Sequence, residues 1–135
     1  MSVTPAGPEP AGSRGRILLV EDDPEAALFA VHVLAKRGQF EVTHTPDPAV
    51  ALQLVAAGRW DLVVTDVEMP GMNGFDLLDA LHRLAPGLPV AVVSAHANLR
   101  ATALLGHADD FLAKPLRIDQ LLATATALIG RATGQ

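Results

Sequence analysis

The hydrophobic residues of this chain gather in short runs that alternate with longer amphipathic segments. Five of these runs have the length of strands, and they cover residues 16–20, 40–42, 60–65, 89–93 and 111–113. Apolar residues at helical spacing between and after the runs predict five helices, over residues 24–38, 48–58, 77–84, 97–105 and 118–129. Because strands and helices alternate strictly, the pattern predicts an α/β domain, a parallel sheet with helices on both faces.

Right-handed crossovers leave few strand orders for such a chain. We expect a doubly wound five-stranded parallel sheet with the flavodoxin-like order 2-1-3-4-5, in which the first and third strands are neighbours. The second strand, residues 40–42, has polar neighbours and is expected at an edge. Ligands of such sheets bind beyond the carboxyl ends of the strands, so four strand ends should surround one crevice.

Aspartate–proline pairs predict where the first two helices begin. Asp23 precedes Pro24 and Asp47 precedes Pro48, which is the arrangement of an N-cap followed by proline in the first turn. Apolar stripes predict the faces that pack on the sheet. The stripe of the first helix is Leu28, Val31, Leu34 and Ala35, and that of the last is Ile118, Leu121, Leu122, Ala125, Leu128 and Ile129.

Length and composition indicate one globular domain. A chain of 135 residues can bury a single core, and 50% hydrophobic with 19% charged residues excludes a wholly disordered chain. Residues 1–15 are rich in proline and glycine and are expected to form a disordered tail. The folded domain is expected over residues 16–130, and residues 131–135 are expected to be a C-terminal tail.

Charge and hydropathy limit the kinds of partner that the chain can bind and the cellular compartment in which we expect it. A net charge of −5 with scattered basic residues argues against direct nucleic-acid binding. The chain has no cysteine, so disulfides and thiolate chemistry are excluded. No apolar run approaches the ~18 residues of a membrane span, and the N-terminus does not resemble a signal peptide. We therefore expect no membrane association and a cytoplasmic location.

Acidic residues stand at the ends of the first and third strands. Glu21 and Asp22 follow residues 16–20, and Asp66 follows residues 60–65. Neighbouring strands lie about 4.8 Å apart, so carboxylates at adjacent ends repel unless a cation lies between them. Mg²⁺ binds carboxylates, water and phosphate oxygens, and is the cation expected here. Helix capping is the alternative for these acids, and it fully explains Asp23.

Asp66, Ser94 and Lys114 are candidates for covalent chemistry in the same crevice. Asp66 leaves a buried strand, and such a carboxylate can attack phosphorus to form an aspartyl phosphate. Its alternative is a structural ion pair with Lys114, which ends the fifth strand before Pro115. Lys114 can also pair with phosphate oxygens, to which the hydroxyl of Ser94 can donate. A serine in this position is otherwise a common turn residue.

These segments together carry a resemblance to a known family. The stretches ILLVEDDP and VVTDVEMPGMNGFDLL are followed by the pairs Ser94-Ala95 and Lys114-Pro115. In this order they resemble the receiver domain of a two-component response regulator, of the kind found in chemotaxis regulators. The resemblance covers about residues 15–130. Its middle stretch is highly specific, and the other segments are specific in combination.

The resemblance implies a role for each site residue. Asp66 would accept a phosphoryl group from a phosphohistidine of a sensor histidine kinase or a histidine phosphotransfer protein. Asp22 and Asp66 would bind Mg²⁺ directly, with the backbone carbonyl of Glu68 as a third ligand. Glu21 would act through a metal-bound water, and Lys114 would contact the phosphoryl oxygens.

The resemblance also implies a switch. Ser94 would move inward to bond the phosphate, and Phe111 would then turn inward into the vacated space. The new surface would bind a downstream protein or support a phosphorylation-linked homodimer. Phe111 stands where tyrosine is commoner, and the 20 residues from Ser94 to Lys114 are fewer than is usual. We therefore expect a short or displaced fourth helix. A single-domain receiver is the leading hypothesis for the chain, and a receiver that forms part of a longer protein is the alternative.

The histidines show no spacing typical of a metal site. Four of them are expected to be ordinary surface or helix residues, and these are His32, His44, His82 and His107. The resemblance places His96 and Glu68 beside the path of the hydrolytic water. We hypothesise that these two residues tune the lifetime of the phosphate.

Two other functions remain open for this sequence. A phosphatase with an aspartyl nucleophile would use Asp66 and Glu68 as a two-acid motif, although the spacing fits poorly and no cap domain encloses a substrate. A scaffold that binds partners without phosphorylation would have no reason to gather acids in one crevice. A receiver that is not an enzyme is the interpretation that the residues favour.

Overall fold

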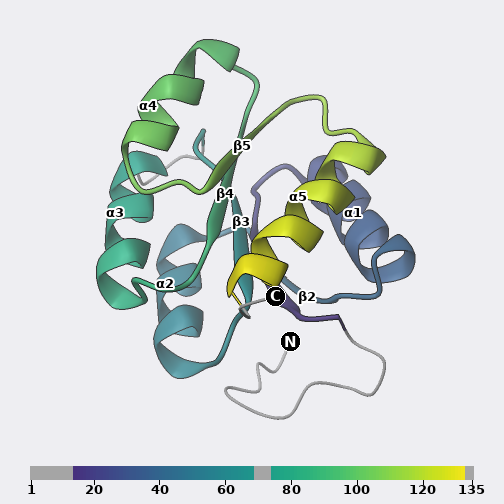
Figure 1. Ribbon diagram of the computed structural model, residues 1–135, viewed down its shortest axis with the longest axis horizontal. Helices are drawn as coiled ribbons and strands as arrows, with labels where there is room; N and C mark the ends of the chain where they lie inside the picture. Colours follow the sequence, from purple (N-terminus) through teal and green to yellow (C-terminus); the bar gives the residue numbers. More distant parts are fainter. Residues whose placement is uncertain (1–13, 69–73, 133–135) are drawn as a thin grey trace.

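A five-stranded parallel sheet with the order β2-β1-β3-β4-β5 forms the centre of the computed structural model, which describes residues 14–68 and 74–132 (Figure 1). Its strands are β1 (Arg16–Val20), β2 (Glu41–Thr45), β3 (Leu62–Asp66), β4 (Val90–Ser94) and β5 (Asp110–Ala113). The predicted order and the edge position of the second strand are confirmed. That strand runs further than predicted because its polar residues pair with β1 while remaining only partly buried.

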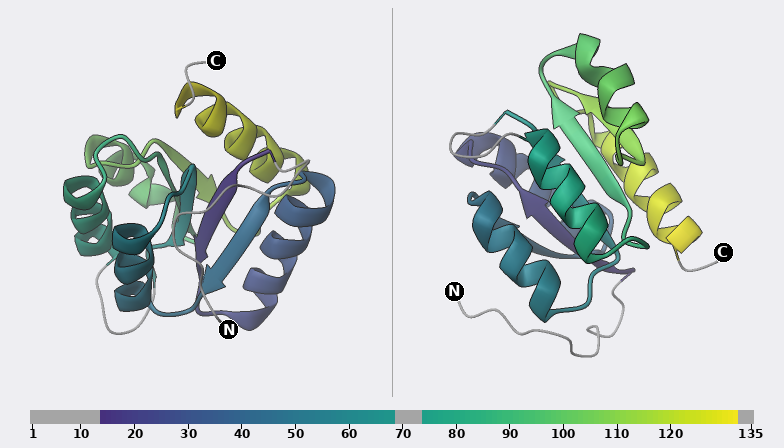
Figure 2. Two further views of the ribbon diagram at one scale, coloured as in Figure 1. Left: turned by 90° about the horizontal axis from the view of Figure 1, so that it is seen from below. Right: turned by 90° about the vertical axis from the view of Figure 1, so that its left-hand side faces the viewer.

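Helices cover both faces of this sheet. They are α1 (Pro24–His32), α2 (Pro48–Ala57), α3 (Gly74–Leu84), α4 (Arg100–Leu105) and α5 (Ile118–Ala132). A π-helical turn, Val33–Arg37, extends α1, and a 3-10 turn, Ala97–Leu99, precedes α4. Figure 1 shows α1 and α5 on one face and α2, α3 and α4 on the other, which the right-hand view of Figure 2 looks onto. The short fourth helix agrees with the sequence prediction.

Two hydrophobic clusters hold the layers together, one on each face of the sheet. Alternate residues of β1 point to opposite clusters, so that Ile17 packs with α1 and α5 while Leu18 packs with α2 and α3. The central strands β1, β3 and β4 are buried on both faces, which accounts for their mainly apolar sequences. This rigid centre fixes the strand ends that carry the polar residues.

The buried face of α1 differs from the predicted stripe. Leu28 is 73% exposed, whereas Ala27 and Ala30 are buried. Leu34, in the π-helical turn after α1, is buried as predicted. Hydrophobicity alone predicts that leucine is buried in preference to alanine. The small alanines are buried here because they let the helix approach the sheet closely. Ile118, predicted to lie in the stripe of α5, is likewise 39% exposed.

The aspartate–proline pairs predict the starts of α1 and α2 correctly. The Asp23 carboxylate accepts a hydrogen bond from Ala26 N–H at the start of α1, and Asp47 accepts one from Ala49 N–H at the start of α2. Gly74 begins α3 against β3, where an added Cβ would lie 2.3 Å from the Cα of Val67. Only glycine permits that approach, which brings α3 close to the end of β3.

The chain ends and one loop lie outside the described residues. These segments are residues 1–13, 69–73 and 133–135, and they include most of the predicted tails and the loop after Glu68. The carbonyl oxygen of Gly15, which composition places in the predicted tail, accepts a hydrogen bond of 2.8 Å from Glu41 N–H. Among the residues described, none of the helices is long and apolar enough to cross a bilayer.

Candidate functional site

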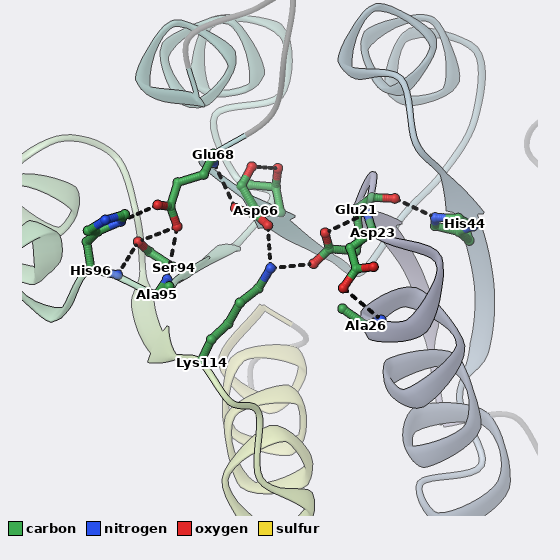
Figure 3. Close-up of polar contacts among 11 residues, drawn as sticks. Glu21, Asp23, Ala26, His44, Asp66, Glu68, Ser94, Ala95, His96 and Lys114 are labelled. Atoms are coloured by element: carbon green, nitrogen blue, oxygen red, sulfur yellow. Dashed lines mark hydrogen bonds and ion pairs between the residues drawn. The ribbon is translucent and has the colours of Figure 1, made fainter.

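Lys114 joins two buried carboxylates at the carboxyl edge of the sheet (Figure 3). Its Nζ lies 2.6 Å from Oδ2 of Asp66 and 3.2 Å from Oε1 of Glu21. Both acids are 3% exposed, so their charges depend on the groups that contact them. The other carboxylate oxygen of Asp66, Oδ1, accepts a hydrogen bond of 2.7 Å from the Glu68 N–H. The ends of β1, β3 and β5 therefore meet at one site, as the strand order predicts.

A cluster of acids beside Lys114 has the composition of a magnesium site. Glu21, Asp22 and Asp66 each offer a carboxylate oxygen, and these oxygens lie within 4.8 Å of one another. Carboxylate oxygens are hard ligands, and Asp22 is exposed, so water can complete the coordination of a cation held there. The donor set fits Mg²⁺, and it consists of the three residues whose side chains were predicted to hold the metal directly or through water.

Two contacts fix Glu21 in this cluster. Asp23 N–H donates to Oε2 of Glu21 at 3.1 Å, and Nε2 of His44 lies 2.8 Å from the backbone carbonyl oxygen of Glu21. His44, expected to be an ordinary surface residue, is partly buried and attaches the edge strand β2 to the site. Asp23 itself is the N-cap of α1 and does not belong to the acid cluster, as its position before Pro24 predicts.

A second polar cluster lies at the end of β4. Oε1 of Glu68 accepts hydrogen bonds from the Ser94 hydroxyl and from Ala95 N–H, each 2.9 Å long. Oε2 of Glu68 forms an ion pair with Nδ1 of His96, and His96 N–H donates to Oγ of Ser94. Figure 3 shows the Glu68 side chain directed toward this cluster. The metal-binding role expected for the Glu68 backbone carbonyl stays a prediction.

Phe111 is buried on the face of the sheet covered by α2, α3 and α4. It is 4% exposed, and its carbonyl oxygen accepts a hydrogen bond of 3.3 Å from Nη1 of Arg100 in α4. The Arg100 guanidinium lies 6.0 Å from the centre of the Phe111 ring. The resemblance led us to expect that Phe111 turns inward after phosphorylation. In the structure the ring is packed inward, because the core of that face accepts it and Arg100 contacts its backbone. The movement of Phe111 on phosphorylation stays a prediction.

The buried charges shift the pKa values of Glu21 and Lys114. Burial raises the pKa of Glu21, and the nearby Asp66 raises it further, against the opposing effects of Asp23 N–H and Lys114. Burial would lower the pKa of Lys114, but the hydrogen bond and charge of Asp66, followed by those of Glu21, outweigh it and raise the pKa. The two carboxylates therefore hold Lys114 as an ammonium.

Glu68 shows the opposite shift. Burial would raise its pKa, but the hydrogen bonds from Ala95 N–H and the Ser94 hydroxyl, together with His96, lower the pKa overall. Glu68 is therefore a carboxylate that the end of β4 stabilises. Sequence reasoning missed the Ala95 amide as a donor, because a backbone group carries no signal of its own. It also missed Arg100, whose role depends on how α4 packs.

Comparison with known proteins identifies the class of this fold and site. A family model described as the response regulator receiver domain matches residues 17–126, and the chain therefore belongs to the response regulator receiver family. The predicted resemblance is thereby confirmed.

Relatives and solved structures are consistent with this membership. The chain is 38% identical to "DNA-binding transcriptional regulator NtrC" of Rhizobium meliloti over 124 residues, 90% of this chain and 25% of that protein. It thus spans about a quarter of that relative's length. A Francisella response regulator receiver domain superposes with a TM-score of 0.80 at 29% identity, covering 87% of this chain and 98% of the other.

A third comparison bears on the metal. The receiver domain of the sensor histidine kinase PA1611 from Pseudomonas aeruginosa superposes with a TM-score of 0.77 at 25% identity, covering 86% of this chain and 98% of that one. It is described with a magnesium ion coordinated in its active site cleft.

Proposed function

We propose that this domain is the phosphoacceptor of a two-component phosphorelay, and that Asp66 takes its phosphoryl group from a phosphohistidine. The donor would be a sensor histidine kinase or a histidine phosphotransfer protein. The observation that carries the proposal is the buried Asp66 carboxylate, held between the ammonium of Lys114 and the acids Glu21 and Asp22. A simple capping or surface acid has no need of this arrangement.

The chemistry of the transfer follows from these groups. An Asp66 carboxylate oxygen attacks phosphorus, the phosphorus–nitrogen bond of the donor breaks, and the imidazole leaves with the electron pair and takes up a proton. Lys114 faces the incoming phosphoryl oxygens and offsets part of their charge. Glu21, Asp22 and Asp66 would hold Mg²⁺, whose charge would offset the negative charge of the phosphoryl group. Ser94 supplies a hydroxyl donor to a phosphoryl oxygen.

A groove beside Lys114 supports a protein donor. It has a volume of about 610 Å³ and lies between the start of α1 and the connection from β5 to α5. Phe29 and Leu116 contribute apolar surface to it, and Phe29 is 38% exposed. An apolar helix of a donor domain could pack here and place its histidine above Asp66.

The downstream partner is proposed to be a protein surface or a second copy of the chain. The net charge of −5 disfavours direct contact of this domain with nucleic acid. We propose a stoichiometric acceptor and not an enzyme that turns over a free substrate.

The decisive experiment is phosphorylation by acetyl phosphate in the presence of Mg²⁺, followed by intact mass, on the wild type and Asp66→Asn. We expect one added phosphoryl group on the wild type and none on the variant. Equal modification of both proteins, or of neither, would overturn the assignment of Asp66. Sustained hydrolysis of a phosphate ester, with catalytic turnover, would instead favour the phosphatase alternative.

A further inference from the structure

The end of β4 presents two hydrogen-bond donors to a single oxygen. Ser94 Oγ–H and Ala95 N–H both point to Oε1 of Glu68, at 2.9 Å each. Two fixed donors that converge on one oxygen form an oxyanion-binding pair. The Ser94 residue is 0% exposed, so water does not compete for its hydroxyl. The two donors therefore form a preorganised anion-binding site, which the Glu68 carboxylate occupies.

The anion in this pair belongs to a residue that also contacts the acceptor. Glu68 N–H donates to Oδ1 of Asp66 at 2.7 Å, while the Glu68 side chain reaches the donors on β4. One residue thus bonds Asp66 through its backbone and fills the neighbouring oxyanion pair through its carboxylate. Figure 3 shows Glu68 spanning the distance between Asp66 and Ser94.

We propose that the Glu68 carboxylate is an internal occupant of the phosphoryl-oxygen site, and that it must leave Ser94 and Ala95 when Asp66 is phosphorylated. This inference rests on the proposed function. Ser94 and Ala95 each have a single hydrogen to donate, so a carboxylate and a phosphoryl oxygen cannot both hold the pair. Phosphorylation also replaces the single negative charge of the Asp66 carboxylate by about −1.5 to −2 on the phosphoryl group, and the added charge repels the Glu68 carboxylate.

The occupant accounts for the buried position of Ser94. Ser94 is fully buried and Phe111 is 4% exposed, an arrangement that the family resemblance assigns to the phosphorylated state. Glu68 supplies the negative oxygen that Ser94 would otherwise lack. Phosphorylation then exchanges one anion for another at the pair, and the side chains that change place are Glu68 and its ion-pair partner His96, whose side chains are 31% and 63% exposed.

The test combines a structural readout with a rate. In unphosphorylated, Mg²⁺-free protein, we expect the amide proton of Ala95 to move upfield in Glu68→Ala, because its hydrogen bond to a carboxylate is lost. With acetyl phosphate and Mg²⁺, we expect Glu68→Ala to be phosphorylated about five- to tenfold faster than the wild type, since no anion must be displaced. Asp76→Asn removes an exposed charge in the first turn of α3 and should change neither quantity.

Glu68→Gln tests the charge of the Glu68 side chain separately from its shape. Its amide oxygen can accept the same two hydrogen bonds without the charge, so its phosphorylation rate should lie between those of the wild type and Glu68→Ala. An unchanged Ala95 amide in Glu68→Ala, or a phosphorylation rate no faster than the wild type, would overturn the inference. Failure of the wild type to be modified at Asp66 would overturn the proposed function, while the Ala95 amide would still decide whether Glu68 occupies the pair.

Discussion

The ammonium of Lys114 and the carboxylate of Asp66 lie 2.6 Å apart, and the same ammonium lies 3.2 Å from Glu21. This contact makes the two interpretations of Asp66, a phosphoryl acceptor and a member of a structural ion pair, compatible. The ion pair places the ammonium of Lys114 against the carboxylate that we propose attacks phosphorus. The lysine that stabilises the resting carboxylate is then in place for the phosphoryl oxygens.

Removing the Lys114 charge should destabilise the fold. Lys114→Met leaves the carboxylates of Glu21 and Asp66 buried and facing each other, so we expect the free energy of unfolding to fall by roughly 1–3 kcal/mol. Urea denaturation measures this change, and Mg²⁺ should restore part of it. Lys36→Met, at an exposed lysine, should have little effect. Equal stability of the two variants would contradict the role of Lys114.

Mg²⁺ should stabilise the domain through the acid cluster. At a concentration 100-fold above its Kd, Mg²⁺ should add about 2.7 kcal/mol to the free energy of unfolding. Asp22→Asn should weaken binding and shift the titration to higher Mg²⁺, because one carboxylate ligand is lost. Asp23→Asn is the matched control, since asparagine caps a helix as well as aspartate does. Thermal unfolding against Mg²⁺ concentration tests both variants, and similar shifts for both would exclude the proposed ligand set.

Strand order and strand ends made much of this site predictable. Glu21, Asp66 and Lys114 follow strands whose parallel arrangement brings their carboxyl ends to one edge, so their convergence follows from the alternating pattern. Asp23 was assigned to helix capping because proline follows it, and the structure confirms the cap. Signals of this kind depend on the local chain and on topology.

Features that depend on side-chain packing were not predictable. The Glu68 carboxylate points toward Ser94 because the Ser94 hydroxyl and the Ala95 N–H both donate to it. Sequence spacing and hydropathy do not predict which rotamer a side chain adopts. The rotation of α1 that exposes Leu28 and buries Ala27 depends on how closely the helix approaches the sheet. The inward Phe111 likewise depends on the space beneath α4.

The contribution of the buried Phe111 ring to the free energy of unfolding can be measured. Phe111→Ala should lower the free energy of unfolding by about 3–5 kcal/mol, because it leaves a cavity in the core. Leu28→Ala, at a residue 73% exposed, should change it by no more than about 0.5 kcal/mol. If the two variants cost the same in chemical denaturation, Phe111 does not lie inward before phosphorylation.

His96 and Glu68 should affect how long the phosphate survives. The family resemblance places both side chains beside the path of the hydrolytic water, so His96→Ala should admit water to the aspartyl phosphate and shorten its half-life by roughly three- to tenfold. Glu68→Ala should act in the same direction. The half-life follows from the loss of phosphorylated protein by intact mass after the donor is removed. Unchanged half-lives in both variants would show that neither residue controls access of water.

The lowered pKa of Glu68 predicts a dependence of stability on pH. A carboxyl whose pKa is lower in the folded state than its ordinary value of 4.5 contributes stability above that value, and the contribution disappears as the pH falls through the folded pKa. The wild type should therefore be more stable than Glu68→Gln near pH 7, and the difference should shrink below about pH 4.5. Urea denaturation at several pH values measures the difference. The same comparison in a His96→Ala background removes the imidazole that faces Glu68. If the stability difference between Glu68 and Glu68→Gln grows on acidification there, the donors of β4 do not stabilise the Glu68 carboxylate.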